Sequence, residues 1–98
     1  MSDFQVYYHH LVIQKDIPKL DQTSGKKIQK AIEQKLTSKP QKYAKPLQNT
    51  LKGLWSLRIG DWRVVFKISG NEIWILRIGH RREVYQKDVR SLVKTSQE

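Results

Sequence analysis

The 98-residue sequence contains no cysteine and has few acidic residues, and these two deficits exclude several kinds of site. Without cysteine there is no disulfide framework, no thiolate metal site and no cysteine nucleophile. Asp and Glu number 9 against 19 Lys and Arg, which gives a formal net charge of +10. Such an excess attracts polyanions, and nucleic acid, an acidic membrane surface and an acidic protein all fit this description.

Long apolar runs are also missing, and the first residues lack the basic-then-apolar pattern of a secretory signal. We therefore expect a cytoplasmic protein that does not cross a membrane. The length allows one domain with a modest core, so residues 1–98 are expected to form a single domain.

The apolar residues that are present first follow a strand pattern and then a helical one. Residues 4–9 alternate and are rich in β-formers, which predicts a strand. Apolar residues then recur at helical spacing over 13–20, where Pro18 should kink or end the helix near Asp16 or Ile17. A second helical stripe contains Ile28, Ala31, Ile32 and Leu36, and it should end at Lys39-Pro40.

After a basic connection over 40–53, the apolar period changes to two. Residues 55–59, 62–68 and 73–78 each alternate, which predicts three more strands. The order β-α-α-β-β-β indicates an α+β fold, with two N-terminal helices packed on an antiparallel sheet. A polar tail follows, with a short helix possible at 88–94.

Two turn signals predict which strand residues share a face. A two-residue loop at Gly60-Asp61 would set Arg58 opposite Arg63. A second such loop at Gly70-Asn71, counted back along the strands, would set Arg63 opposite Ile78, with His80 on the same side. The helix-facing side would then carry Trp55, Leu57, Ile59, Trp62, Val64, Phe66, Ile68, Ile73 and Ile75. The other side would carry Ser56, Arg58, Arg63, Val65, Lys67, Trp74, Leu76, Ile78 and His80.

The expected pairing of Arg58 with Arg63 is informative because directly opposed like charges destabilise a sheet. Either an anion lies between them, or both are splayed into water or paired with acids. Arginine suits the first interpretation because its planar fork binds phosphate bidentately. On that interpretation the open face holds a phosphate-binding groove.

The densest chemistry follows the last strand, in Gly79-His80-Arg81-Arg82-Glu83-Val84-Tyr85. Cleavage of RNA needs a proton removed from the 2′-hydroxyl, a stabilised pentavalent phosphate and a proton for the leaving 5′-oxygen. An imidazole or a phenol can move protons, and guanidiniums can hold the charge. Equally, Tyr85 could pack its ring, and Arg81-Arg82 could be a solvated pair.

A metal site or a carboxylate pair has poor candidates in the sequence. His9 and His10 are adjacent and would point to different faces, and His80 has no partner at ligand spacing. Between residues 51 and 85 the acids are only Asp61, Glu72 and Glu83. We therefore expect neither a metal nor a small-molecule cofactor, and no carboxylate-pair chemistry.

Taken in order, Leu51-Lys52-Gly53, the stretch Leu57 to Phe66, Ile78-Gly79-His80-Arg81 and Val84-Tyr85 resemble the RelE/ParE toxins, and the RelE branch most closely. The resemblance implies a toxin held by a cognate antitoxin, which enters the ribosome and cleaves messenger RNA through the 2′-hydroxyl. Carried over by position, Arg63 would stabilise the transition-state phosphate, and Arg81 would bind phosphate or act as the acid. Tyr85 would orient or activate the 2′-hydroxyl or stack on a base, and His80 would take part in proton transfer. The expected RNA-binding residues are Arg58, Lys52, Lys67 and Arg82.

The sequence departs from the family pattern in one strand. The best-known ribosome-dependent members carry lysines along the strand that matches 54–59, where this chain has only Arg58, preceded by Lys52. The general base therefore stays open, because a tyrosine with a pKa of about 10 needs neighbouring cations to act near neutrality. Two other functions also stay open: a ParE-like inhibitor of DNA gyrase, which usually lacks the Arg-x-x-x-Tyr element, and a non-catalytic RNA-binding module.

Overall fold

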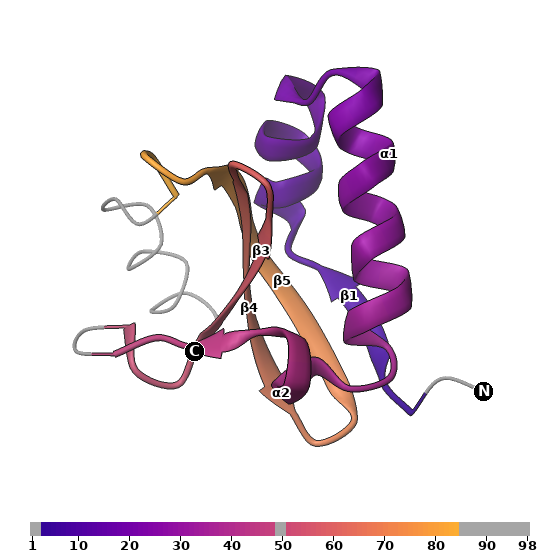
Figure 1. Cartoon of the computed structure of the whole chain (residues 1–98), viewed down its shortest axis with the longest axis vertical. Helices are drawn as coiled ribbons and strands as arrows, with labels where there is room; N and C mark the ends of the chain where they lie inside the picture. The colour runs from indigo at the N-terminus through magenta and orange to yellow at the C-terminus, as the bar shows by residue number, and fades with distance from the viewer. Residues whose placement is uncertain (1–2, 49–50, 85–98) are drawn as a thin grey trace.

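The computed structural model describes residues 3–48 and 51–84, which form a five-stranded sheet with helices on one face (Figure 1). The strands are β1 (Gln5–Tyr8), β2 (Lys45–Pro46), β3 (Trp55–Ile59), β4 (Trp62–Ser69) and β5 (Glu72–His80). Their spatial order is β1-β5-β4-β3-β2. The expected antiparallel pairing holds among β3, β4 and β5; β2, which was not predicted, pairs antiparallel with β3, and β1 joins β5 in parallel. The sheet is therefore mixed. The two helices connect β1 at one edge of the sheet to β2 at the other edge.

The helices follow the expected pattern closely. The first consists of η1 (Val12–Asp16), a π-helical segment, and η2 (Ile17–Lys19), a tighter 3₁₀ turn. The change falls at Ile17, directly before Pro18, as the proline predicts. The second consists of α1 (Gln22–Ala31) and η3 (Ile32–Leu36), and α2 (Pro40–Tyr43) is a single short turn in the connection.

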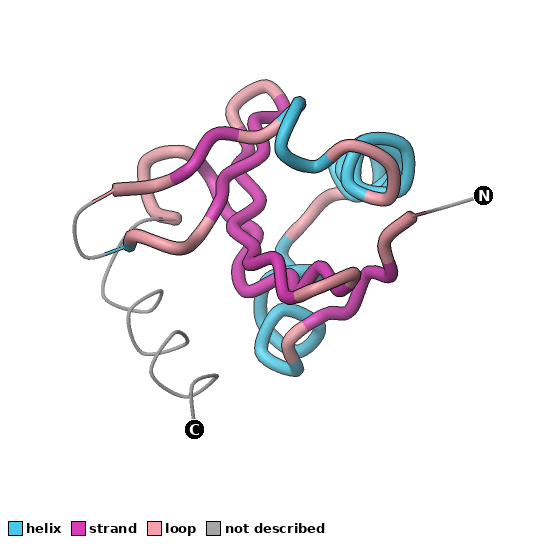
Figure 2. The backbone as a smooth tube through the Cα atoms, turned by 90° about the horizontal axis from the view of Figure 1, so that it is seen from below, coloured by secondary structure: helices cyan, strands magenta, loops and turns pink. Residues whose placement is uncertain are grey.

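The helices bury one face of the sheet, because helix residues such as Val12 and Ile28 lie in one core with Phe66 of β4; Figure 2 shows the helices and strands from below. The first helix lies over β5, and α1 lies over β3. The stripe Ile28, Ile32 and Leu36 is buried, as its helical spacing predicts. The main core consists of Val12, Ile28, Ile32, Leu36, Ala44, Leu57, Ile59, Val64, Phe66, Ile73, Ile75 and Ile78.

One residue of β5 breaks the expected register. Ser69 pairs with Glu72 as predicted, but Val65 pairs with Arg77 and Phe66 with Ile75, which leaves Leu76 as a bulge. An extra residue shifts every later side chain to the other face. Two of our expectations are therefore wrong: Arg63 lies opposite Gly79, not Ile78, and Ile78 belongs to the main core.

The bulge also brings a second, smaller apolar cluster to the face away from the helices, which we call the far face. Leu54, Val65, Leu76 and Val84 are buried there, with Leu47, Leu51 and Trp74 packed around them. The middle of the far face is therefore apolar. A continuous basic groove across it, as the sequence suggested, is wrong, and the charged residues lie at its ends.

Two expectations lie outside the described residues: the short helix at 88–94 and the position of Tyr85. Within the described part, no helix is both long and apolar enough to cross a membrane.

Candidate functional site

The β3–β4 hairpin places two arginines directly across from each other. Ile59 pairs with Trp62, and Arg58 pairs with Arg63, as the two-residue loop predicts. Gly60 has φ +60°, the left-handed conformation that the first position of this turn needs and that glycine adopts at little cost. Arg58 is exposed, and Arg63 is half-buried. The pair therefore concentrates positive charge at one end of the far face.

The Arg63 guanidinium is held by the backbone of the same hairpin. One terminal nitrogen donates to the carbonyl of Gly60 at 2.8 Å and to the carbonyl of Trp62 at 2.9 Å. These bonds use one nitrogen of a guanidinium that carries five N–H donors. The remaining donors are available to an anion, and the group is fixed in place before one arrives.

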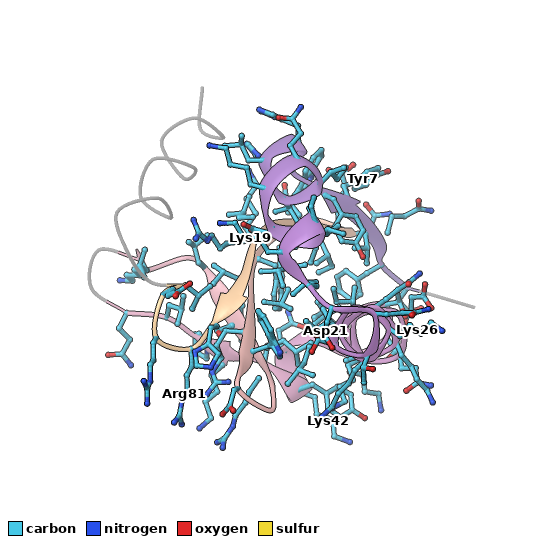
Figure 3. The ribbon with its side chains drawn as sticks, turned by 90° about the horizontal axis from the view of Figure 1, so that it is seen from above. Tyr7, Lys19, Asp21, Lys26, Lys42 and Arg81 are labelled. Carbon is cyan, nitrogen blue, oxygen red and sulfur yellow. The ribbon has the colours of Figure 1, made fainter. Side chains whose placement is uncertain are left out.

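A third arginine reaches the same turn from the end of β5. The Arg81 N–H donates to the Asp61 carbonyl at 2.8 Å, and Arg81 Nε lies 3.8 Å from Asp61 Oδ1. Both side chains are more than half exposed, so this ion pair is weak and can open toward another anion. We call Arg58, Arg63 and Arg81 the arginine cluster; Figure 3 labels Arg81.

The turn after β5 is positioned by burial of Val84. Glu83 and Val84 both donate their N–H groups to the His80 carbonyl, which closes the turn. Val84 is fully buried, and a Cβ at Gly79 would lie 3.4 Å from the Val84 Cβ. The close approach to Gly79 and the burial of Val84 in the far-face cluster together fix the residues on either side of Arg81.

His80 lies on the other face of the sheet from Arg63. It pairs with Trp62, and its ring meets the Trp62 ring edge-on with centroids 6.0 Å apart. Its Nδ1 accepts the N–H of Arg82 at 3.4 Å. The bulge is the reason that His80 and Arg63 do not share a face, as they were expected to do. Arg82 is exposed within the same turn.

Two of the expected RNA-binding lysines lie away from the arginine cluster. Lys52 is exposed and precedes β3 at the end opposite Arg58, and β3 itself is about 17 Å long. Lys67 is half-buried on β4, four residues or about 13 Å from Arg63, and pairs with Trp74. The structure thus brings together Arg58, Arg63 and Arg81, with Arg82 in the adjoining turn.

Tyr85 is the next residue after the last one described. Val84, the last described residue, is buried in the far-face cluster with Leu54 and Val65, on the face that also carries Arg63.

Two acids that the sequence analysis did not assign help to build this end of the molecule. Asp16, a buried residue at the end of η1, accepts the N–H of Ile78 at 2.9 Å and lies 4.0 Å from Arg77 Nε. It thereby accepts a backbone N–H of β5 beyond the last residue of β5 that pairs with β1. Asp61 orients Arg81, and its place in the Gly60-Asp61 turn was a usable signal. Nothing in the local sequence marks Asp16.

Two residues away from the arginine cluster, Tyr8 and His9, have shifted pKa values. Burial, and secondarily His10 and Lys67, lowers the pKa of His9 below its usual value. Burial, and secondarily Glu33, raises the pKa of Tyr8. Neither group belongs to the arginine cluster, so we assign neither to the chemistry.

The arginine cluster has the character of a phosphate site. Arg58 and Arg63 are paired beside the Gly60-Asp61 turn, Arg81 contacts Asp61 of that turn, and the Arg63 guanidinium is pre-oriented by backbone carbonyls. Such donors bind phosphate and stabilise charge that develops on it. Among residues 3–48 and 51–84, His, Asp and Glu side chains do not gather in threes that could hold a metal ion.

Two curated relatives match about half of this chain. Toxin RelG of Mycobacterium tuberculosis is 33% identical over 54 residues, and toxin RelE of the same organism is 40% identical over 53 residues. These matches cover 53% and 52% of this chain, and 62% and 55% of the respective relatives. The chain thus spans somewhat more than half the length of the curated relatives it matches.

The fold has a solved counterpart in the RelBE2 toxin–antitoxin complex of Mycobacterium tuberculosis. That structure matches with a TM-score of 0.75 and 26% identity, over 81% of this chain and 99% of the other. The family model for the ParE toxin of type II toxin–antitoxin systems matches residues 3–85, which include every described element. The chain therefore belongs to the ParE toxin family, as its resemblance to the RelE/ParE toxins predicted.

Proposed function

We propose that this protein is an endoribonuclease toxin that cuts messenger RNA on the ribosome without a metal. The observation that carries the proposal is the arginine cluster, in which Arg58 and Arg63 are paired across the β3–β4 hairpin and Arg81 contacts Asp61 in the turn of that hairpin. Similarity to toxins named RelE and RelG supports the RelE-like activity. The net charge of +10 favours an RNA substrate.

The proposed reaction is a transfer within the RNA. The 2′-oxygen attacks the adjacent phosphorus, the bond from phosphorus to the 5′-oxygen breaks, and a 2′,3′-cyclic phosphate and a 5′-hydroxyl result. Arg63 stabilises the charge on the pentavalent phosphate, because its orientation is set before the substrate binds. Arg58 holds the neighbouring backbone, and Arg82 and the more distant Lys52 and Lys67 add phosphate contacts.

Proton transfer is assigned to Arg81 and Tyr85. Tyr85 orients or deprotonates the 2′-hydroxyl, and Arg81 neutralises or protonates the leaving 5′-oxygen. Cations of the cluster would lower the phenol pKa toward neutrality. His80 shares a face with Trp62 and not with Arg63, so we give it the role of shaping the turn through Nδ1.

An antitoxin is the proposed partner, and this proposal is supported by the similarity to a toxin solved in a RelBE2 toxin–antitoxin complex. Ile13 and Ile17 are exposed apolar residues on the first helix, among basic neighbours such as Lys15 and Lys19. Such a surface suits an acidic amphipathic helix. Inhibition would follow if this partner neutralised Arg58, Arg63 or Arg81, or displaced the segment around Tyr85. A complex that left all four open would contradict the mechanism.

Inhibition of DNA gyrase is the competing function, because the matching family model carries the ParE description. One experiment separates the two. The protein is expressed in bacterial cells without an antitoxin, beside an Arg63→Ala/Tyr85→Phe double variant, and the 5′ ends of messengers are mapped. New cuts in coding sequence that vanish in the double variant support the nuclease, whereas growth arrest with intact messengers supports the gyrase inhibitor.

A further inference from the structure

A second feature lies on the far face, at the end opposite the arginine cluster. Tyr7 on β1 pairs with Trp74 on β5, and Trp74 pairs with Lys67 on β4, so the three residues form a row across three strands. The rings of Tyr7 and Trp74 are stacked, with centroids 4.9 Å apart and planes 20° from parallel. We call this row the aromatic platform. Figure 3 shows Tyr7 on the opposite side of the molecule from Arg81.

The platform is fixed and partly open to solvent. Trp74 Nε1 donates to a Glu72 carboxylate oxygen at 3.1 Å, which satisfies the polar edge of the indole and sets the angle of its ring. Trp74 also packs against the buried far-face cluster. Tyr7, by contrast, is 38% exposed, although its neighbours Val6 and Tyr8 pack against the main core. The exposed ring therefore rests on an anchored one.

Trp74 has a carboxylate and a cation beside it: Glu72 on β5 and Lys67 on β4. Lys67 ends the row, and His9 follows β1 on the same side, with its ring stacked on His10 at 4.4 Å. Lys67 is close enough to His9 to affect its titration. An exposed flat ring stacked on a second ring, with a cation at the other end of the row, has the composition of a surface that holds single-stranded nucleic acid by base stacking and phosphate contact.

Tyr43 is a second exposed tyrosine, and its surroundings differ from those of Tyr7. It is 45% exposed, but Lys35 and Lys42 each place their ammonium 5.7 Å from the centre of its ring. The Tyr43 ring therefore already has cation–π partners within the protein. Tyr7 is instead stacked on an aromatic neighbour, with the cation at the far end of the row.

We propose that the aromatic platform stacks an unpaired base of single-stranded RNA, while Lys67 binds an adjoining phosphate. The proposal rests on the proposed function, since it extends the RNA contact about 13 Å along β4 from Arg63. The chain would then hold its substrate at two points of one face, the scissile phosphate at the arginine cluster and a more distant base at Tyr7.

The test measures binding with cleavage disabled. The full-length protein is titrated with a 2′-O-methyl oligouridine of about ten nucleotides, which cannot undergo 2′-hydroxyl attack, and with an abasic oligomer of equal length. Tyr7→Leu keeps an apolar side chain in the strand and removes the flat ring, and Tyr43→Leu is the matched control. We expect Tyr7→Leu to weaken binding of the oligouridine about tenfold and to leave the abasic oligomer unchanged. Tyr43→Leu should change neither.

Two further variants sharpen the result. Tyr7→Phe keeps the ring and should bind the oligouridine as the wild type does. If Tyr7→Leu proves unfolded, weaker binding by a folded Tyr7→Phe would contradict stacking by the ring. Lys67→Gln should reduce the slope of log affinity against log salt by about one.

Equal weakening on both oligomers, or none in Tyr7→Leu with a native fold, would overturn the platform as a base-stacking site. If Tyr7→Leu instead lost affinity only for the antitoxin, the platform would be a protein contact. The nuclease proposal is tested separately by cutting, so either proposal can fail while the other stands.

Discussion

On the helix-covered face of the sheet, Phe66, Ile73 and Ile75 are completely buried beneath two helices, whereas the far face buries a smaller group of residues and leaves arginines exposed at its end. The main core contains residues from the helices and from three strands. The far-face cluster contains Val84, which follows the sheet and closes the turn that carries Arg81. Burial on the helix-covered face stabilises the fold. Burial on the far face also holds the turn that carries the charged Arg81. Substitutions should therefore separate stability from activity according to face.

The largest effect is expected from the main core. Phe66→Ala should lower the free energy of unfolding by about 3–5 kcal/mol, because it removes a ring that has no exposed surface. Chemical denaturation measures this directly. A loss no greater than that of Val84→Ala would erase the distinction between the two faces.

The arginine cluster should show the opposite behaviour. Arg63→Lys should reduce messenger cutting about 100-fold, because a lysine cannot keep the bonds to the Gly60 and Trp62 carbonyls and also grip phosphate bidentately. Its free energy of unfolding should change by less than about 1 kcal/mol. Lys26→Gln, on the exposed side of α1, is the control and should cut normally. A parallel fall in stability and cutting for Arg63→Lys would mean that Arg63 acts through the fold.

Val84 should combine both behaviours. Val84→Ala should cost about 1–2 kcal/mol of stability and also reduce cutting in the fully folded protein, because Val84 fixes the turn around Arg81. Val12→Ala removes an equally buried valine from the main core and serves as the match. It should cost similar stability and leave cutting by the folded protein unchanged. Identical cutting by the two variants would show that the far-face cluster does not position the site.

The smallest effect is a pH dependence at the far-face end that holds His9. Burial, His10 and Lys67 lower the pKa of His9 below its ordinary value of 6.5, so the unfolded chain takes up this proton first as the pH falls. Above pH 6.5 His9 is neutral in both states and does not change the stability. As the pH falls from 6.5 toward the lower pKa of the folded state, protonation of His9 in the unfolded chain reduces the free energy of unfolding. Denaturation at about pH 7.5 and about pH 5.5 should show a smaller loss in His9→Gln than in the wild type. Equal losses would remove His9 from this account.

The parts of the fold that local chemistry dictates could be predicted from the sequence. Pro18 ends the regular part of the first helix, and Gly60-Asp61 sets the hairpin and hence the Arg58–Arg63 pairing. Period-two and helical patterns identified the strands and the helical stripe because each reflects one-sided burial. The three arginines of the cluster were singled out by residue type, and in the structure Arg58 pairs with Arg63 while Arg81 contacts Asp61 in the adjoining turn; their role in chemistry stays a prediction.

The remainder depended on tertiary packing. The bulge at Leu76 has no glycine to mark it; beside it, Leu76 packs with Val65 in the far-face cluster, and the Ile78 N–H donates to Asp16 of the first helix. That single residue moved Ile78 into the main core and separated His80 from Arg63. The parallel pairing of β1 is likewise a long-range contact that no local pattern specifies.

In the mechanism that we propose, the arginine cluster promotes attack by the 2′-hydroxyl of the messenger. The most direct measurement uses ribosomes loaded with a synthetic messenger that carries a single 2′-deoxyribose at a mapped cut position. We predict that the purified protein cuts the unmodified messenger to a 2′,3′-cyclic phosphate and leaves the modified position intact. Cutting at the deoxyribose, or intact messengers beside inhibited gyrase supercoiling, would contradict the account.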